Sequence, residues 1–295
     1  MEVIRASVLG RCMGVRRAVD LALALADEAR ASGAGPVFSL GPLIHNPQAV
    51  AELESRGILP LGPGELDGRL RGKAIVIRAH GVPPELRARL EELGARIVDA
   101  TCPRVIASQR KAAALAAAGR IVVLAGDRDH AEIAGIAGHT RAAGARDCPV
   151  VGSPEEAGRL ELPEGAPVAI IAQTTIKEEE YREICEALRA RRPDLEVVDS
   201  ICPATEERRA ALAELARGCD AIVVVGGRNS ANTSRLLGSA LALGKPAWLV
   251  ETAAELPPEV FSRERVGLTA GASTPDELVA EVEAALLAGG REPGP

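Results

Sequence analysis

Continuous apolar runs and amphipathic stretches alternate along the whole chain. Segments such as IVVLAGDR (121–128) and AIVVVGGR (221–228) each begin with five consecutive apolar residues. Such runs are typical of parallel strands that helices bury on both faces. Their alternation with helical patterns predicts an α/β protein with doubly wound, mostly parallel sheets. Ligands of such sheets bind beyond the carboxyl ends of the strands, so polar residues at those ends are the candidates for function.

The chain contains an internal repeat with a period of about one hundred residues. The segments IVDATCP (97–103) and VVDSICP (197–203) are both strand-like and both end in Cys-Pro. A looser third copy is VIRASVL (3–9), which leads to Cys12 and then to an amphipathic helix. Adding the shorter strand-like segments gives about four strands per copy. We therefore expect three pseudo-repeated lobes, each with a mostly parallel sheet of about four strands.

The repeat also predicts where the lobes begin and end. If the lobes pack around a pseudo-threefold axis, their strand ends face one central cavity. The chain exceeds the length that one hydrophobic core usually organises, which favours several lobes over one domain. We expect three lobes and a C-terminal tail, at residues 1–97, 98–196, 197–280 and 281–295.

Composition narrows the possible partners. The net charge is −6, which argues against a general nucleic-acid or anionic-membrane surface, because those partners need a basic field. We find no secretory leader pattern and no apolar stretch long enough to span a bilayer, so we expect a cytoplasmic protein. An anionic ligand would need a local pocket.

Six cysteines in a cytoplasmic chain favour metal ligation or redox chemistry over a disulfide framework. Cys12, Cys102 and Cys202 occupy the same place in the three copies. Three thiolates are one fewer than a closed structural zinc site has, and one fewer than a fully cysteine-ligated 4Fe-4S cluster, which would leave one iron open. The remaining cysteines have no counterpart in the repeat, and we expect them to be core-packing residues: Cys148, Cys185 and Cys219.

A second recurring set of residues suits anion binding. In each copy a polar residue follows a strand-end glycine by four positions, and another follows a later buried strand. Hydroxyls, imidazoles and first-turn N–H groups there can converge on phosphate oxygens. The candidates are His45, His80, His130, Thr174, Ser230, Asn232 and Ser273. Taken singly, a Ser, Thr or Asn at a helix start is as well explained as an N-cap.

Glu132 is the one carboxylate in this set. It follows His130 by two residues and could deliver protons if the cavity raises its pKa toward neutrality. It could equally be a first-turn glutamate that the helix dipole favours. The sequence leaves both interpretations open.

The motifs together resemble the 4-hydroxy-3-methylbut-2-enyl diphosphate reductases of the LytB type, the last enzymes of the non-mevalonate isoprenoid pathway. The resemblance runs from about Arg5 to Asp276. It is carried, in chain order, by GRCMGVRRAV (10–19), IHNPQ (44–48), RAHGV (78–82), DATCP (99–103), HAE (130–132), QTT (173–175), ICPAT (201–205), GGRNSANT (226–233) and TAGASTP (269–275).

This resemblance implies a trefoil of three lobes around one 4Fe-4S cluster per chain, bound by Cys12, Cys102 and Cys202 with one iron open. It implies that Glu132 is the proton source and that Thr174 lies close to the reacting carbon skeleton. A ferredoxin or flavodoxin would supply two electrons, and the products would be isopentenyl and dimethylallyl diphosphate. The implied diphosphate ligands are His45, His80, His130, Ser230, Ala231 through its backbone N–H, Asn232 and Ser273.

Three positions depart from the family pattern. Arg11 stands where Phe usually precedes the first cysteine and brings an unexpected charge near it. Ala131 replaces the Pro of the usual His-Pro-Glu, so we expect Glu132 to be less rigidly placed. Ala231 replaces a serine, so only its backbone N–H can reach phosphate.

Two other functions would use the same repeats. A cluster or zinc sensor would hold a metal at the three cysteines but would not turn over an allylic diphosphate. A phosphosugar or nucleotide enzyme without a metal would keep its activity in a Cys102→Ser variant. Glu132 and the phosphate-type ring favour the reductase, because a sensor needs neither.

Overall fold

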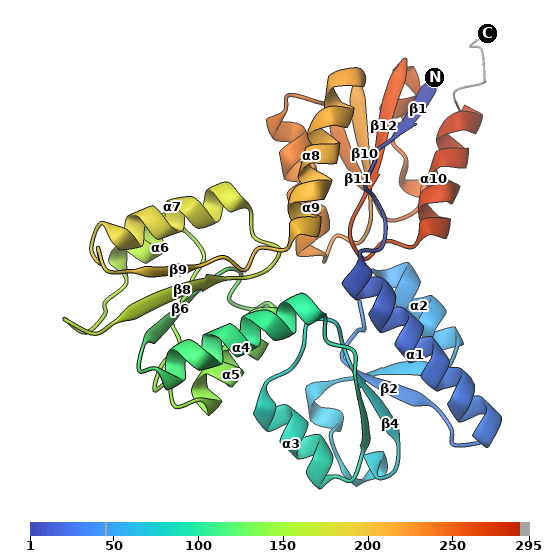
Figure 1. Ribbon diagram of the computed structural model, residues 1–295. Coiled ribbons are helices and arrows are strands. Elements are labelled where there is room, and N and C mark those ends of the chain that lie inside the picture. Colours follow the sequence, from blue (N-terminus) through green and yellow to red (C-terminus); the bar gives the residue numbers. More distant parts are fainter. Residues whose placement is uncertain (45, 290–295) are drawn as a thin grey trace. The chain divides into compact units, whose positions relative to one another are not determined.

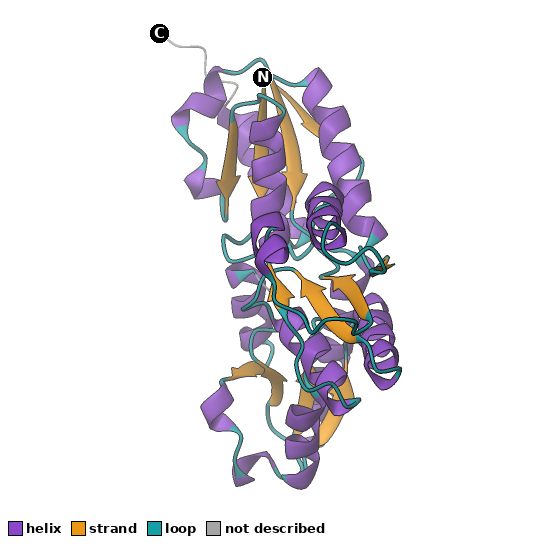
Figure 2. Cartoon of the chain, turned by 90° about the vertical axis from the view of Figure 1, so that its left-hand side faces the viewer, coloured by secondary structure: helices purple, strands orange, loops and turns teal. Residues whose placement is uncertain are grey.

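The residues described by the computed structural model, 1–44 and 46–289, form three four-stranded sheets (Figure 1). Every strand pair in these described segments is parallel. Helices accompany the strands, as Figure 2 shows in purple and orange. The predicted α/β class with three repeated parallel sheets is therefore confirmed. His45 lies outside the described residues.

The first sheet has the strand order β3-β2-β4-β5. Its helices α2 and α3 begin with proline, which fits the first turn because that position needs no N–H donor. The elements of this region are α1 (Met13–Ser32), β2 (Val37–Leu40), α2 (Pro47–Ser55), β3 (Ile58–Leu61), η1 (Pro63–Glu65), η2 (Gly68–Leu70), β4 (Ala74–Ile77), α3 (Pro84–Glu92) and β5 (Arg96–Asp99).

The second sheet repeats this order as β7-β6-β8-β9. Neighbouring residues of β6 face opposite sides of the sheet: Val123 packs in a core cluster with α7, and Val122 packs in another with α4 and α5. Two such clusters explain the continuous apolar pattern of the strand. The elements are α4 (Pro103–Ala117), β6 (Ile121–Ala125), α5 (Ala131–Ala142), β7 (Val150–Val151), α6 (Pro154–Arg159), β8 (Val168–Ala172), α7 (Glu178–Arg189) and β9 (Glu196–Val198).

The third sheet has the order β1-β12-β10-β11, in which the first strand of the chain pairs with the last. β10 again separates two core clusters, one with α10 and one with α8 and α9. The elements are β1 (Glu2–Arg5), α8 (Pro203–Gly218), β10 (Ala221–Val225), α9 (Ala231–Ala242), β11 (Ala247–Val250), η3 (Ala253–Glu255), η4 (Pro258–Ser262), β12 (Arg265–Ala270) and α10 (Asp276–Gly289).

β1 takes the place in the third sheet that β5 and β9 take in the other two. The predicted first lobe, residues 1–97, therefore includes a strand that pairs with β12 rather than with its own sheet. In the other two sheets, the strand before the repeated cysteine comes last in chain order and forms an edge. The strand before Cys12 has no preceding sheet in the chain, so it completes the sheet built by the C-terminal segment.

The described residues divide into two compact units. The Cys12 unit contains the described parts of Met1–Arg16, Ile44–Arg56 and Pro203–Pro295, and the Cys102 unit contains Arg17–Leu43 and Gly57–Cys202. The predicted lobe boundaries stay a prediction. Among the helices of the described residues, none combines the length and the apolar character that a bilayer crossing requires.

Candidate functional site

The three repeated cysteines occupy equivalent positions in the fold. Each follows an edge strand, and the next residue begins a helix, so each thiol lies near a helix N-terminus. Each backbone N–H donates to the carbonyl oxygen of the residue two positions beyond the end of the neighbouring strand. These bonds join Cys12 to Ala272 (3.0 Å), Cys102 to Ala79 (2.9 Å) and Cys202 to Thr174 (2.8 Å).

The other cysteines have a different environment. They are buried in core clusters, as predicted for packing residues, whereas the repeated cysteines are partly exposed. Burial raises the pKa of the Cys148 and Cys185 thiols to about 11, and it also raises the pKa of the Cys219 thiol. These three side chains therefore stay protonated and unsuited to metal binding.

Within the described residues, no group of three or more His, Cys, Asp and Glu side chains is close enough to hold a metal ion. Cys12 belongs to one compact unit, and Cys102 and Cys202 belong to the other. The three-cysteine metal site therefore stays a prediction.

Two histidines lie together in the Cys102 unit. His130 is the N-cap of α5, and its Nδ1 accepts a hydrogen bond from the Glu132 backbone N–H at 3.2 Å. A neutral imidazole that accepts at Nδ1 carries its hydrogen on Nε2. His80, in the loop after β4, meets the His130 ring edge to face, with 5.2 Å between the ring centroids. Two of the three imidazoles predicted from the sequence, His80 and His130, thus lie side by side.

Glu132 is a buried carboxylate that Thr174 hydrogen-bonds twice. Its side chain is almost fully buried, with 1% of the residue exposed. The Thr174 backbone N–H donates to Oε1 at 2.7 Å, and the Thr174 hydroxyl donates to Oε2 at 2.9 Å. Two hydrogen bonds from a single residue fix the carboxylate in position. These two bonds orient the carboxylate whatever residue stands at position 131. That Ala131 leaves Glu132 less rigidly placed than a proline would stays a prediction.

Gln173 supports this arrangement, although the sequence reasoning did not single it out as a site residue. It is fully buried, and its Oε1 accepts from the Asp127 N–H at 2.9 Å. Its Nε2 donates to the Thr175 hydroxyl, also at 2.9 Å. Gln173 thereby joins the loop after β6, which leads to His130, to the loop after β8. The sequence feature that could have indicated a role for Gln173 is its position immediately before Thr174.

The Cys12 unit carries the second group of predicted residues, at the start of α9. Ser230 is the N-cap of this helix, and its hydroxyl accepts from the Thr233 N–H at 3.4 Å. Ser230 therefore acts as a helix cap, the alternative that the sequence left open. Ala231 and Asn232 follow in the first turn. The Asn232 Nδ2 is buried and has no hydrogen-bond partner among the described residues.

Ser273 belongs to the same unit, in the loop between β12 and α10, and is buried. The neighbouring Thr274 hydroxyl donates to the Val225 carbonyl at 3.0 Å, which ties this loop to the end of β10. The loop is thus held at the strand end after which α9 begins.

Arg11 lies against α2 within the Cys12 unit. It forms a loose ion pair with Glu52, with 3.9 Å between Nη2 and Oε2. Only 18% of the Arg11 side chain is exposed, and its buried Nε has no partner in the described part of the chain. The unexpected charge is therefore not directed to solvent.

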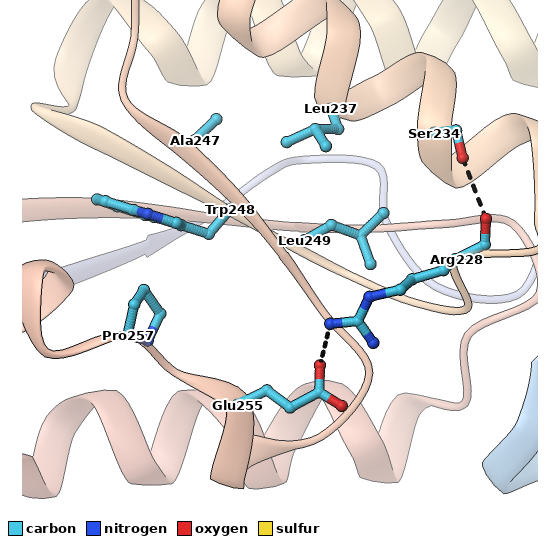
Figure 3. A pocket seen from close by; sticks show the side chains of 8 residues that line it. All are labelled: Arg228, Ser234, Leu237, Ala247, Trp248, Leu249, Glu255 and Pro257. Carbon is cyan, nitrogen blue, oxygen red and sulfur yellow. Dashed lines mark hydrogen bonds and ion pairs between the residues drawn. The ribbon is translucent and has the colours of Figure 1, made fainter.

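A surface pocket in the Cys12 unit is separate from these residues (Figure 3). Arg228 lines this pocket and donates to Glu255 at 2.6 Å, so the charge of the guanidinium is already balanced. No residue from the predicted set lines this pocket, which is formed by Arg228, Ser234, Leu237, Ala247, Trp248, Leu249, Glu255 and Pro257.

Proteins of known name match the sequence of this chain over nearly its full length. The 4-hydroxy-3-methylbut-2-enyl diphosphate reductase of Treponema denticola is 47% identical over 98% of this chain and 100% of that protein. The reductase of the same name from Aquifex aeolicus is 38% identical over 96% of this chain and 95% of that protein.

Solved structures of reductases with this activity in their names are also similar to this chain. A structure of (E)-4-hydroxy-3-methyl-but-2-enyl diphosphate reductase, described as the terminal enzyme of the non-mevalonate pathway, is 36% identical. It aligns with a TM-score of 0.71 over 98% of this chain and 100% of that chain. The corresponding reductase from Plasmodium falciparum is 24% identical, with a TM-score of 0.86 over 96% and 87% of the two chains, and shares the fold.

The sequence model described as "LytB protein" matches residues 3–287, which is nearly the whole chain. Together with the identity to the curated reductases, this match shows that the chain belongs to the LytB family.

Proposed function

We propose that this chain reduces 4-hydroxy-3-methylbut-2-enyl diphosphate to isopentenyl and dimethylallyl diphosphate. The main support is the 38–47% identity to reductases of that name over nearly the full chain. In the reaction, two electrons and two protons convert the substrate's C–OH into C–H and water. A ferredoxin or flavodoxin would donate the electrons.

We infer that Cys12, Cys102 and Cys202 would hold a 4Fe-4S cluster. Their donor chemistry fits this group, because cysteine sulfur is the usual ligand of such clusters and these three thiols are partly exposed at helix starts. The three buried cysteines do not fit it. When bound, such a cluster supplies single electrons and, with three cysteine ligands, a Lewis-acidic iron with an open position.

Each unit by itself carries donors that suit a diphosphate. His130, with its hydrogen on Nε2, can donate to a phosphate oxygen, and His80 beside it can do the same. In the other unit, the buried Asn232 Nδ2 has no acceptor among the residues that the structure describes, which supports a role for a ligand oxygen. The remaining proposed ligands are Ser230, the Ala231 backbone N–H, Ser273 and His45, the last outside the described residues.

Glu132 and Thr174 would deliver a proton together. Oε2 and the Thr174 Oγ1 are 2.9 Å apart, which is within proton-transfer distance. When Glu132 is protonated at Oε2, the hydroxyl of Thr174 can accept that hydrogen bond and donate its own hydrogen to the substrate. Thr174 would therefore pass the proton from the buried carboxyl group to the departing hydroxyl.

An anaerobic assay tests this proposal. The chain is purified and reconstituted without oxygen, then given the allylic diphosphate, dithionite and a mediator dye. We expect about four irons per chain and formation of both five-carbon diphosphates. An iron-loaded chain that produces neither would contradict the proposal and favour a sensor. A Cys102→Ser variant that keeps full activity would favour a metal-independent enzyme.

A further inference from the structure

Three basic side chains connect the surroundings of the repeated cysteines. Each lies on the helix that follows one cysteine and donates to a backbone carbonyl one to three residues before the next. The bonds run from Arg17 on α1 to Thr101 (3.2 Å), from Lys111 on α4 to Asp199 (3.0 Å), and from Arg208 on α8 to Gly10.

These contacts follow a cyclic order. The helix after Cys12 reaches the loop before Cys102, the helix after Cys102 reaches the loop before Cys202, and the helix after Cys202 reaches the loop before Cys12. Each contact joins residues of a single compact unit. A pattern that recurs once per repeat is unexpected if the three bonds are incidental surface contacts.

Arg208 is the most buried of the three. Only 3% of the residue is exposed, although a guanidinium is seldom buried unless it is paired. Besides the Gly10 carbonyl, it donates to the Ala204 carbonyl at 3.2 Å. Arg208 thus contacts the backbone two residues before Cys12 and two residues after Cys202.

The loop before Cys12 needs such a restraint. Gly10 has a positive φ of 73°, and a Cβ there would lie 2.5 Å from an Asp276 carboxylate oxygen. Residues with side chains rarely adopt this conformation. The Arg208 bond to the Gly10 carbonyl and the Cys12 N–H bond to Ala272 together hold the loop on both sides of the turn.

We propose that Arg17, Lys111 and Arg208 are positioning residues, each of which holds the loop that carries one cysteine. The effect should be largest for Arg208, intermediate for the half-buried Arg17 and smallest for the exposed Lys111, because exposed polar contacts contribute little. The cluster at these cysteines is part of the proposed function, whereas the role of the three basic residues in holding the loops is independent of that function.

Alkylation of the cluster-free chain tests each loop separately. The chain is exposed briefly to iodoacetamide under argon, and mass spectrometry gives a rate for each cysteine. In Arg208→Met, we expect Cys12 to react about tenfold faster, the order of effect of losing a hydrogen bond from a charged donor. The rates at Cys102 and Cys202 should not change.

The other two variants should shift the effect to a different cysteine. Arg17→Met should speed alkylation of Cys102, and Lys111→Met should speed that of Cys202 only slightly. Arg208→Lys, which can still donate to one carbonyl, should restore most of the Cys12 protection. Arg217→Met is the matched control, because Arg217 is an exposed arginine on the same helix.

Two results would overturn the proposal. One is an Arg208→Met chain with wild-type circular dichroism and an unchanged Cys12 rate. The other is equal acceleration at all six cysteines, which would mean a general loss of stability. If Arg208→Met does not fold, Arg17→Met and Arg208→Lys decide by the same criteria.

Iron retention provides a second readout in the reconstituted chain. Iron loss to a chelator should be faster in Arg208→Met than in Arg217→Met, and Arg208→Lys should lie near the control. If the cysteine-specific alkylation pattern appears but the chain shows no reductase activity, the proposed function fails and the positioning role stands.

Discussion

The loops after β6 and β10 have the same backbone but different chemistry. A glycine with positive φ directly follows each strand, Gly126 with φ 154° and Gly226 with φ 148°. A Cβ on Gly126 would lie 2.6 Å from Gln173 Oε1, and a Cβ on Gly226 would lie 2.7 Å from Thr274 Oγ1. Both loops then enter a twelve-residue helix through a side-chain N-cap.

The two helix starts differ in whether their polar groups are already bonded. Glu132 at the start of α5 receives two hydrogen bonds from Thr174, whereas the Asn232 amide nitrogen at the start of α9 has no partner in the described segments. The start of α5 therefore holds a hydrogen-bonded carboxyl group, and the start of α9 holds an amide donor whose hydrogen-bonding capacity is unused within the described residues. The two repeats share a backbone arrangement, and the residues at equivalent positions in it differ in their hydrogen bonding.

The largest expected effect is on turnover in Glu132→Gln. The amide can keep the contacts with Thr174 but cannot supply a proton, so kcat should fall by about two orders of magnitude or more while KM changes little. Steady-state assays with the allylic diphosphate measure both constants. Asn232→Leu should do the opposite and mainly raise KM. Near-normal kcat in Glu132→Gln would remove this residue from the proton path.

Substitutions that affect the same two helix starts should differ in their effect on the free energy of unfolding. Thr174→Val removes the hydroxyl that donates to a buried carboxylate, so the free energy of unfolding should fall by about 1.5–3 kcal/mol. Asn232→Leu removes a buried donor that has no partner among the described residues, so this free energy should stay unchanged or rise. Urea unfolding of the cluster-free chain under reducing conditions gives both values. An equal loss in the two variants would mean that the Asn232 amide has a structural partner.

A smaller effect concerns pH. Burial lowers the pKa of His139 on α5, and the carboxylates of Glu85 and Asp99 only partly oppose this. Because the unfolded chain takes up this proton more readily, the free energy of unfolding should decrease as the pH falls below about 6.5 toward the folded pKa. His139→Gln should lose less stability than wild type between about pH 7.5 and about pH 5.5. The equivalent Ser239 on α9 does not titrate, and Ser239→Gln should behave like wild type.

The smallest expected effect is on the free energy of unfolding, and it concerns the first residue of α5 and of α9. His130 has the extended conformation (φ −76°, ψ 137°) that a following proline requires. Ala131→Pro should therefore raise the free energy of unfolding by about 0.4–1 kcal/mol without altering activity. Ala231→Pro should stabilise the chain similarly but raise KM, because it removes the N–H proposed to bind phosphate. Equal kinetics in the two variants would contradict that role.

Much of this architecture could be predicted because its causes are local. Apolar runs such as 121–125 and 221–225 form the expected strands, since helices cover both of their faces. The strand-cysteine-helix segments at Cys102 and Cys202 are also local, as is the capping by Ser230. The three core cysteines were recognisable because they fall outside the repeat.

Other features depended on contacts between distant segments. Thr174 holds Glu132 across 42 positions, and Arg208 reaches Gly10 across 198. No local pattern around Ala131 indicates that a threonine on another loop binds the Glu132 carboxylate. The roles of the repeated residues toward a cluster or a diphosphate rest on the family resemblance and stay predictions.

Sheet membership separates what the amino-acid order decides from what folding decides. The adjacent β-branched residues Val3 and Ile4 favour a strand at residues 2–5, because such side chains fit the pleated backbone. Which strand pairs with it is settled only when the chain ends meet, and its partner proves to be β12, more than 260 residues away. Strand formation follows from neighbouring residues, whereas strand pairing depends on which open sheet edge is available when the chain packs.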